Sequence, residues 1–233
     1  MATVQATYQM GLRRANLSET VTTHQDWARD YLNAIIKEIE GEATWWWKFK
    51  TGTITTVAST RTYSLASDTL SLVGVFDTSN NRHLHIEGPR FAQSLDPDLS
   101  ETGDPRVIYP LGLDSSGYMQ AGLYPTPSAT SDSITYQYYG YTPDFTSADD
   151  STSLDTYIHP SVQPALYFGV ARLLRQQEGD DEGAVIEEAE FQKVMARARR
   201  QNIDVMGDHR ARRDLPPKTS TGFNFIPREG SLS

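Results

Sequence analysis

The sequence predicts an α+β fold, in which a helical bundle of about four helices carries an inserted antiparallel β-sandwich or β-barrel module and an extended C-terminal arm. Charge supports this division, because residues 51–157 hold 13 acidic residues, four arginines and no lysine, so the whole net charge of −9 lies there. Composition changes at the same borders, from helix formers in both flanks to Thr, Ser, Tyr, Gly and Pro in the middle. We therefore expect a discontinuous helical domain (1–50 and 158–205), a β-rich domain (51–157) and an arm (206–233).

Two helices are expected in the N-terminal flank, over residues 4–12 and 23–44. In the second, Thr23 and Asp26 stand three residues apart, a spacing typical of a helix N-terminus. Its large apolar side chains recur every four residues and form one stripe, which consists of Trp27, Tyr31, Ile35 and Ile39.

Three adjacent tryptophans, Trp45, Trp46 and Trp47, follow this helix. Neighbouring side chains diverge by about 100° on a helix and about 180° on a strand, so the three cannot all face one core. Two alternatives stay open: at least one tryptophan meets the other domain or another chain, or all three are buried between the helices and the sheet. We take them as candidate residues of a subunit or domain interface, together with Phe191 and Met195.

The middle region reads as short strands punctuated by Gly, Pro, Asn and Asp, the pattern of a small sandwich or barrel. Asn80 and Asn81 indicate a tight turn. Residues 87–105 form a long excursion with a helical turn near Phe91, and residues 142–157 form a polar, acidic loop. The expected strands cover residues 52–57, 61–65, 70–77, 82–87, 106–111, 118–124 and 134–141.

Two helices are expected in the C-terminal flank. Pro160 fits the first turn of a helix that is apolar around most of its circumference, which predicts the central helix of the bundle. Gly179 should end it, and the acidic residues 180–182 favour the start of the next helix. That last helix is expected to end near Ile203. Its apolar positions are Val185, Ala189, Phe191, Met195 and Ala198.

Basic residues gather at the end of this helix, seven of them between residues 192 and 213 against Asp204 and Asp208. The stretch fits a solvated helix end, a protein contact or a nucleic-acid contact. The segment beyond it is too poor in apolar residues to build a core, but its aromatic side chains can be buried on a partner. The candidate docking residues of the arm are Arg210, Arg212, Arg213, Phe223, Phe225 and Ile226.

Composition and missing motifs exclude several functional classes. The absence of cysteine excludes a disulfide framework, a thiol nucleophile and a zinc ribbon, and a reducing compartment is expected. No apolar segment approaches the roughly 20 residues of a membrane span, and the first residues lack a signal-peptide core, so we expect a soluble chain. Net negative charge argues against bulk attraction to nucleic acid or to an anionic membrane.

Catalytic and metal-binding patterns are weak. The sequence has no phosphate-binding loop, dinucleotide fingerprint, nucleophile elbow or zinc-protease motif. His83, His85 and Glu87 alternate along one expected strand, but without a fourth ligand we interpret them as an exposed strand face. The acidic residues at 149–150 and 180–182 are interpreted as solvated. We predict no enzyme, no cofactor and no bound metal.

The order of these features resembles the head-to-tail adaptor proteins of tailed bacteriophages, a group that includes the tail tubular proteins of short-tailed phages. The resemblance spans about residues 23–203, with departures at Ala66, where many relatives have proline, and at Ile158 and His159, which replace a leucine. It depends on Asn33-Ala34, Trp45-Trp46-Trp47, Tyr63-Ser64-Leu65, Gly103-Asp104-Pro105 with Tyr109, Leu123-Tyr124-Pro125-Thr126-Pro127, Tyr136-Gln137-Tyr138-Tyr139 and Pro160.

The resemblance implies a structural virion protein of the neck, assembled in the host cytoplasm without a membrane. In similar adaptors, twelve copies form a ring below the portal protein, the helical domain forms the ring body around the DNA channel, and the β module lies outside or toward the tail. The implied partners are further copies of the chain, the portal, a tail-side nozzle, stopper or tail terminator, and double-stranded DNA that passes without sequence-specific binding. The arm would dock on the portal.

Three further hypotheses follow from the residues. The acidic middle region would repel DNA phosphate wherever it faces a channel. The tyrosine-rich strands allow a glycan-binding or tail-fibre module, because tyrosines stack on sugars as well as fill cores. A hydrolase would need acids such as Asp104 and Asp155, which nothing in the sequence pairs.

Overall fold

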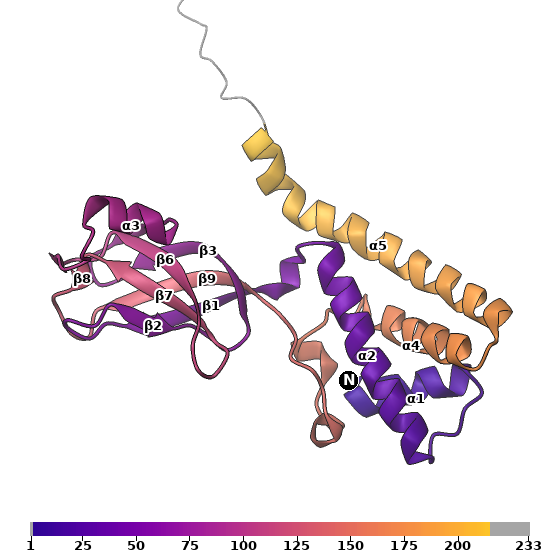
Figure 1. Cartoon of the computed structure of the whole chain (residues 1–233). Helices are drawn as coiled ribbons and strands as arrows, with labels where there is room; N and C mark the ends of the chain where they lie inside the picture. The colour runs from indigo at the N-terminus through magenta and orange to yellow at the C-terminus, as the bar shows by residue number, and fades with distance from the viewer. Residues whose placement is uncertain (1, 215–233) are drawn as a thin grey trace, which may run out of the picture.

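The computed structural model describes residues 2–214, and the surroundings of the side chains of residues 2–205. Figure 1 shows two units side by side, which we call the helical unit and the β unit. This arrangement confirms the predicted fold class. The helical unit consists of α1 (Val4–Arg14), α2 (Thr22–Glu42), α4 (Gln163–Gln177) and α5 (Asp181–Asp214).

The helical unit is built around α4, as its apolar circumference predicts. This helix packs against α1, α2 and α5 and buries both faces. The expected stripe of α2 contributes Ile35 and Ile39 to the core, while Trp27 and Tyr31 lie partly buried at its edge. The core also contains Tyr8, Leu12, Leu32, Leu166, Leu174, Phe191 and Met195, each fully buried.

The starts of two helices differ from the sequence-based expectation. The cap residue of α2 is Val21, which makes no side-chain cap, so the Thr23–Asp26 spacing does not mark its start. Pro160 precedes α4 because residues 159–162 form a separate turn, closed by a hydrogen bond from the Val162 amide to the His159 carbonyl; Pro164 occupies the first turn instead. The expected end of α4 at Gly179, with φ of +77°, is confirmed.

The last helix, α5, continues past Ile203 to Asp214, so the part of the expected arm up to residue 214 is helical. Residues 203–214 include methionine, alanine and three arginines, which favour helix, and only Gly207 opposes it. At the other end, Asp180 accepts a hydrogen bond from the Gly183 amide and pairs with Arg175. Asp180 is therefore a capping residue rather than a merely solvated acid.

The β unit contains one curled seven-stranded sheet and a small two-stranded one. The strands of the large sheet are ordered β1-β9-β3-β4-β6-β7-β2, and β5 pairs with β8. All seven expected strands are present, and Asn81 adopts φ of 51° in the turn expected after β3. The elements are β1 (Phe49–Thr55), β2 (Thr62–Ser64), β3 (Thr69–Asp77), β4 (Arg82–Ile86), α3 (Pro89–Leu95), β5 (Thr102–Gly103), β6 (Val107–Leu113), β7 (Met119–Tyr124), β8 (Thr126–Pro127) and β9 (Ser133–Gly140).

The large sheet is antiparallel except between β4 and β6, which run parallel. A parallel pair needs a crossover of a dozen residues or more, and the long excursion after β4 provides it. The helix α3 lies on this crossover and buries Ala92 against Val107, Tyr109 and Tyr124. The main core of the unit includes Ile54, Val75, Ile108, Leu123, Ile134, Tyr136 and Tyr138.

The chain enters the β unit by β1 and leaves it by β9, and these strands are neighbours, with Phe49 opposite Tyr139. From there residues 141–162, which we call the return segment, lead back to α4. This segment contains two short 3₁₀ turns, Ser147–Asp149 and Leu154–Thr156. Because entry and exit are side by side, the two covalent connections between the units pass through the same place.

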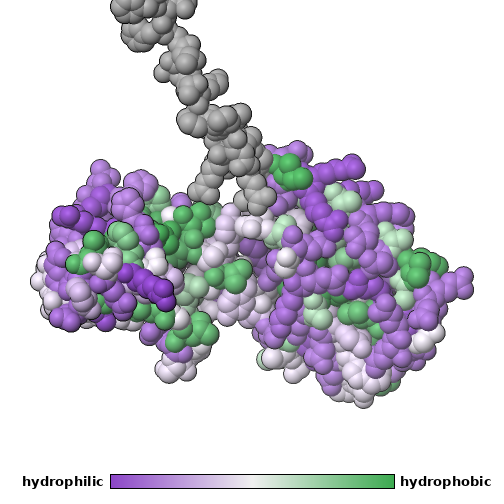
Figure 2. Space-filling model, turned by 45° about the horizontal axis from the view of Figure 1, so that its top comes forward, coloured by the Kyte–Doolittle hydropathy of each residue, from purple (hydrophilic) through white to green (hydrophobic). Residues whose placement is uncertain are grey.

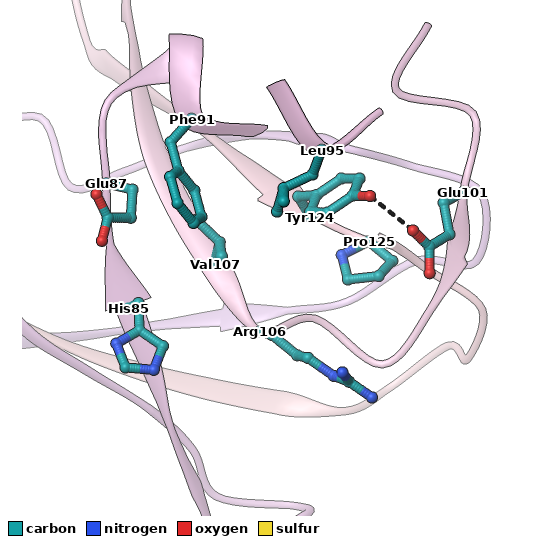
Figure 3. Close-up of a pocket in the computed structure, with 9 residues that line it drawn as sticks. All are labelled: His85, Glu87, Phe91, Leu95, Glu101, Arg106, Val107, Tyr124 and Pro125. Atoms are coloured by element: carbon teal, nitrogen blue, oxygen red, sulfur yellow. Dashed lines mark hydrogen bonds between the residues drawn. The ribbon is translucent and has the colours of Figure 1, made fainter. Parts of the chain in front are cut away.

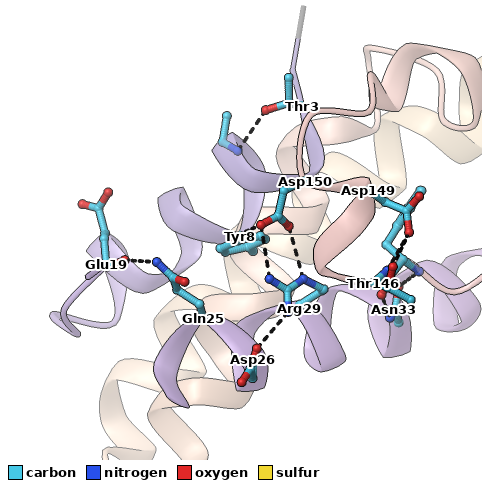
Figure 4. A network of polar contacts seen from close by, with 12 residues as sticks. Thr3, Tyr8, Glu19, Gln25, Asp26, Arg29, Asn33, Thr146, Asp149 and Asp150 are labelled. Atoms are coloured by element: carbon cyan, nitrogen blue, oxygen red, sulfur yellow. Dashed lines mark hydrogen bonds and ion pairs between the residues drawn. The ribbon is translucent and has the colours of Figure 1, made fainter. Parts of the chain in front are cut away.

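The return segment is held on α1 and α2 by a polar network (Figure 4). Arg29 of α2 pairs with Asp150 at 3.2 Å, and the Tyr8 hydroxyl donates to the same carboxylate at 3.0 Å. The Asn33 amide exchanges two hydrogen bonds with the backbone of Phe145, at 3.0 and 2.9 Å. Asp150 is thus a partly buried anchor, and its interpretation as a solvated acid is wrong because Arg29 reaches it from another element.

Two helical glycines predict opposite effects on stability. A Cβ atom at Gly169 of α4 would lie 2.8 Å from three atoms of Ile35, whereas one at Gly41 of α2 would meet nothing within 4 Å. We expect Gly169→Ala to lower the free energy of unfolding by about 1 to 3 kcal/mol through overpacking. Gly41→Ala should raise it by up to about 1 kcal/mol, because alanine favours helix. Urea unfolding followed by circular dichroism measures both, and equal effects would contradict the close packing of α2 and α4.

Candidate functional site

A buried ion pair lies where the two connections between the helical unit and the β unit run side by side. Lys48 ends the short 3₁₀ turn Trp46–Lys48 directly before β1 and is 5% exposed. Its ammonium group contacts Glu40 of α2 and the Thr142 hydroxyl of the return segment. Glu40 also accepts from the Thr142 amide, at 3.2 Å. Burial lowers the pKa of Lys48, and the hydrogen bond and charge of Glu40 oppose that shift. These three residues join the entry strand, the return segment and α2.

The tryptophan cluster lies beside this ion pair. Trp45 is buried, donates from Nε1 to the Ile39 carbonyl at 2.6 Å and stacks on Trp47 with ring centroids 4.6 Å apart. Trp46 and Trp47 are only partly buried and both pack on His159, at 5.0 and 5.9 Å. The structure therefore buries Trp45 within the chain and leaves part of Trp46 and Trp47 at the surface.

The same cluster anchors α5. The Asn202 side chain accepts from the Trp46 amide and donates to the Thr44 carbonyl, each at 3.0 Å. Asn202 is the last residue of α5 whose side chain is buried among residues 2–205. One accepted and one donated hydrogen bond thus hold α5 at Asn202 against the segment between α2 and β1.

Phe191 and Met195, expected at an interface, are fully buried in the core of the helical unit. They lie on the inner face of α5, together with Ala184, Ala198 and Asn202. Within the single chain neither side chain is exposed. Their apolar spacing reflects packing within the chain, which a sequence pattern alone does not separate from packing between chains.

The outer face of α5 is basic and partly apolar. Arg197, Arg200 and Ile203 share this face at intervals of three residues, and Ile203 is 66% exposed. Arg199 points elsewhere and pairs with Glu42 of α2 at 2.9 Å. Of the expected arm residues, Arg210, Arg212 and Arg213 fall in the last turns of α5, where side-chain surroundings lie outside the described residues. Phe223, Phe225 and Ile226 lie outside the described residues altogether.

A cavity of about 600 Å³, which we call the α3 groove, lies between α3 and the sheet (Figure 3). Leu95 projects from α3 toward Tyr124, whereas the Phe91 ring points toward Val107, and with Pro125 these side chains form the apolar walls. Charged and polar residues line its rim. They are His85, Glu87, Glu101 and Arg106.

One hydrogen bond stiffens the rim of the α3 groove. The Tyr124 hydroxyl donates to Glu101 at 2.6 Å, and this bond raises the pKa of Tyr124 to about 12. The phenol therefore stays protonated at neutral pH. No local sequence pattern predicts the groove, because its walls come from segments up to 40 residues apart. The only local signal was Phe91 and Leu95, four residues apart on an expected helical turn.

Exposed apolar side chains occur on both units, and Figure 2 shows such surface in green on each of them. On the β unit, Leu95 is 55% exposed and Leu113, near the β6–β7 turn, is 71% exposed. On the helical unit the most exposed ones belong to α5. They are Val185, Ile186 and Ile203. Single exposed apolar residues need no explanation, but those of the α3 groove and of α5 stand among charged residues.

The other residues singled out in the sequence are not brought together. Asp104 pairs with Arg82 in the β unit, whereas Asp155 accepts from Gln163 in the helical unit. The His83 ring packs at a tilt against Phe76, and within the described residues no group of three His, Cys, Asp or Glu could hold a metal ion. No described helix has the length and apolarity of a membrane span. The strand tyrosines Tyr109, Tyr124, Tyr136 and Tyr138 are buried in the cores of the β unit.

Residues 7–214 match the family model described as SU10 adaptor protein, which covers both units and all of α5. A search of curated proteins finds no match.

The contribution of the buried ion pair between Lys48 and Glu40 to stability can be tested by mutation. Glu40→Gln leaves the Lys48 charge buried without a counter-charge, and we expect it to lower the free energy of unfolding by about 3 to 5 kcal/mol. The matched control is Asp144→Asn, which removes the exposed ion pair that Lys37 of α2 makes with the same return segment. That change should cost less than about 1 kcal/mol. Urea unfolding at pH 7 measures both, and similar small effects would show that the buried pair does not hold the junction.

Proposed function

The chain belongs to the SU10 adaptor protein family, and from this membership we propose that it is the head-to-tail adaptor of a tailed bacteriophage, joining the portal vertex to the tail. The family is one of phage structural adaptors and not of enzymes. The match over residues 7–214 is the observation that carries the proposal, because it includes both units.

A ring of identical copies is the form in which we propose that the chain acts. A closed ring built head to tail needs two different surfaces on each subunit. The chain offers unlike surfaces of this kind, since the outer face of α5 is basic and the region around α3 is acidic and apolar. Twelve copies are expected from the resemblance to other adaptors, with the portal on one side and a nozzle, stopper or tail terminator on the other.

DNA would pass through the channel of such a ring without sequence-specific binding to the protein. The chain carries a net charge of −9, and its acidic residues outnumber the basic ones only in the region 51–157. Carboxylates that face a channel repel phosphate, so DNA slides past them without adhering. Virion assembly would take place in the host cytoplasm.

Imaging of the purified protein mixed with portal rings tests the proposal. We expect negative-stain particles in which each portal carries a ring of twelve copies, about 313 kDa for twelve chains of 26.1 kDa. The protein without portal is the control for self-assembly. A stable trimer that ignores the portal would contradict the adaptor role and favour a tail-fibre module.

The C-terminal segment supplies a second prediction. Ending the chain after Asp214 removes Phe223, Phe225 and Ile226, and we expect attachment to the portal to be lost while helical circular dichroism per residue is kept. The full-length variant Phe223→Ser with Phe225→Ser controls for length, because it removes only the apolar anchors. Co-sedimentation with portal rings is the measurement, and undiminished attachment of both variants would refute docking through this segment.

A further inference from the structure

The α3 groove stands in an acidic part of the β unit. Residues 87–106 carry five acidic residues against two arginines. Glu101 lines the groove and is exposed, and Asp98, three residues after Leu95 in the chain, is exposed as well. The apolar walls are formed in part by Phe91 and Leu95, which are 41% and 55% exposed. An apolar floor with carboxylates around it is the surface that a basic amphipathic helix fits.

The outer face of α5 is such a helix face. Residues 193–205 carry four basic residues against Asp204. Arg197, Arg200 and Ile203 lie on one face, and Ile203 with Val205 is among the more exposed apolar residues of the helical unit. The charges of the two surfaces are therefore opposite, and each surface has exposed apolar side chains to bury.

These two surfaces do not meet within one chain. The helix α5 lies along the helical unit, whereas α3 covers the β unit (Figure 1). No hydrogen bond or ion pair that the structure gives for residues 2–205 joins α5 to α3 or to the rim of the groove. A contact between them has to come from another copy.

We propose that the outer face of α5 of one copy docks in the α3 groove of the next copy. Ile203 would enter between Phe91 and Leu95, and Arg197 and Arg200 would face the carboxylates of Glu101 and Asp98. The contact joins two unlike surfaces, so it leaves an α5 face and an α3 groove free at the two ends of every pair and extends until a ring closes. This inference rests on the proposed ring and names the surfaces that build it.

Disulfide crosslinking tests the contact directly, because the chain has no cysteine of its own. The double variant Leu95→Cys with Ile203→Cys places one thiol on each surface, at two exposed positions that tolerate the change. With portal rings present and a mild oxidant added, we expect a ladder of dimers, trimers and larger species on a non-reducing gel. Each single-cysteine variant is the control and can yield dimers at most. A disulfide needs Cα atoms within about 7 Å, so the ladder reports contact between these positions.

Charge reversal tests the electrostatic part of the same contact. Arg200→Glu should weaken ring assembly roughly tenfold, because two like charges would then face each other, and Asp98→Lys in the same chain should restore it. Arg199→Glu is the matched control, since it makes the same change of charge on the side of α5 that faces α2. Assembly is measured as the protein concentration at which half of the portal rings carry an adaptor ring.

The outcomes separate this inference from the proposed function. Rings on the portal with a crosslinked ladder and charge rescue support both. Rings without a ladder, or with Arg200→Glu no weaker than Arg199→Glu, overturn the α5 contact and leave the adaptor role intact. An absence of rings together with an absence of the ladder overturns both.

Discussion

The arrangement of the two units depends on the buried contact of Lys48 with Glu40 and Thr142. The chain crosses between the units twice, and because β1 and β9 are neighbours, both crossings occur at this contact. A lysine that is only 5% exposed is costly without a counter-charge. The end of α2, the entry to β1 and the return segment therefore have to come together for the charge to be satisfied. This contact thereby couples α2 and the entry to β1, which are close in sequence, to Thr142 of the return segment, 94 residues after Lys48.

The other polar contacts repeat this principle on a smaller scale. Asp150 of the return segment contacts Arg29 and Tyr8, and Asn33 binds the backbone of the same segment. Asn202 of α5 binds the segment between α2 and β1, which contains the three tryptophans. Each side chain makes hydrogen bonds or ion pairs that join two elements. Apolar packing alone would allow these elements to slide along each other. The helical core supplies the burial, and these contacts set how the elements are aligned.

The sequence predicted well what depends on local patterns. Strands bounded by turn residues, the turn at Asn81, the apolar circumference of α4 and its end at Gly179 all follow from side-chain periodicity and backbone preference. It failed where tertiary contact decides. Pro160 and Thr23 are good local signals for a helix start, but neither marks the start of a helix in the structure. Asp150 looks solvated until Arg29 is placed beside it. Phe191 and Met195 have the same spacing whether they face a core or a partner. The α3 groove combines residues 85–125, and no local pattern indicates their meeting.

The anchor at Asn202 has a mechanical consequence for the rest of α5. From Asn202 to Asp214 the helix rises by about 18 Å at 1.5 Å per residue, so this portion acts as a lever whose pivot is a pair of hydrogen bonds. Each degree of tilt at the pivot shifts the far end by about 0.3 Å at this length. Slight repacking of the tryptophans beneath Asn202 would therefore be magnified into a displacement of the helix tip, and a load applied to that tip would be felt where the two units join.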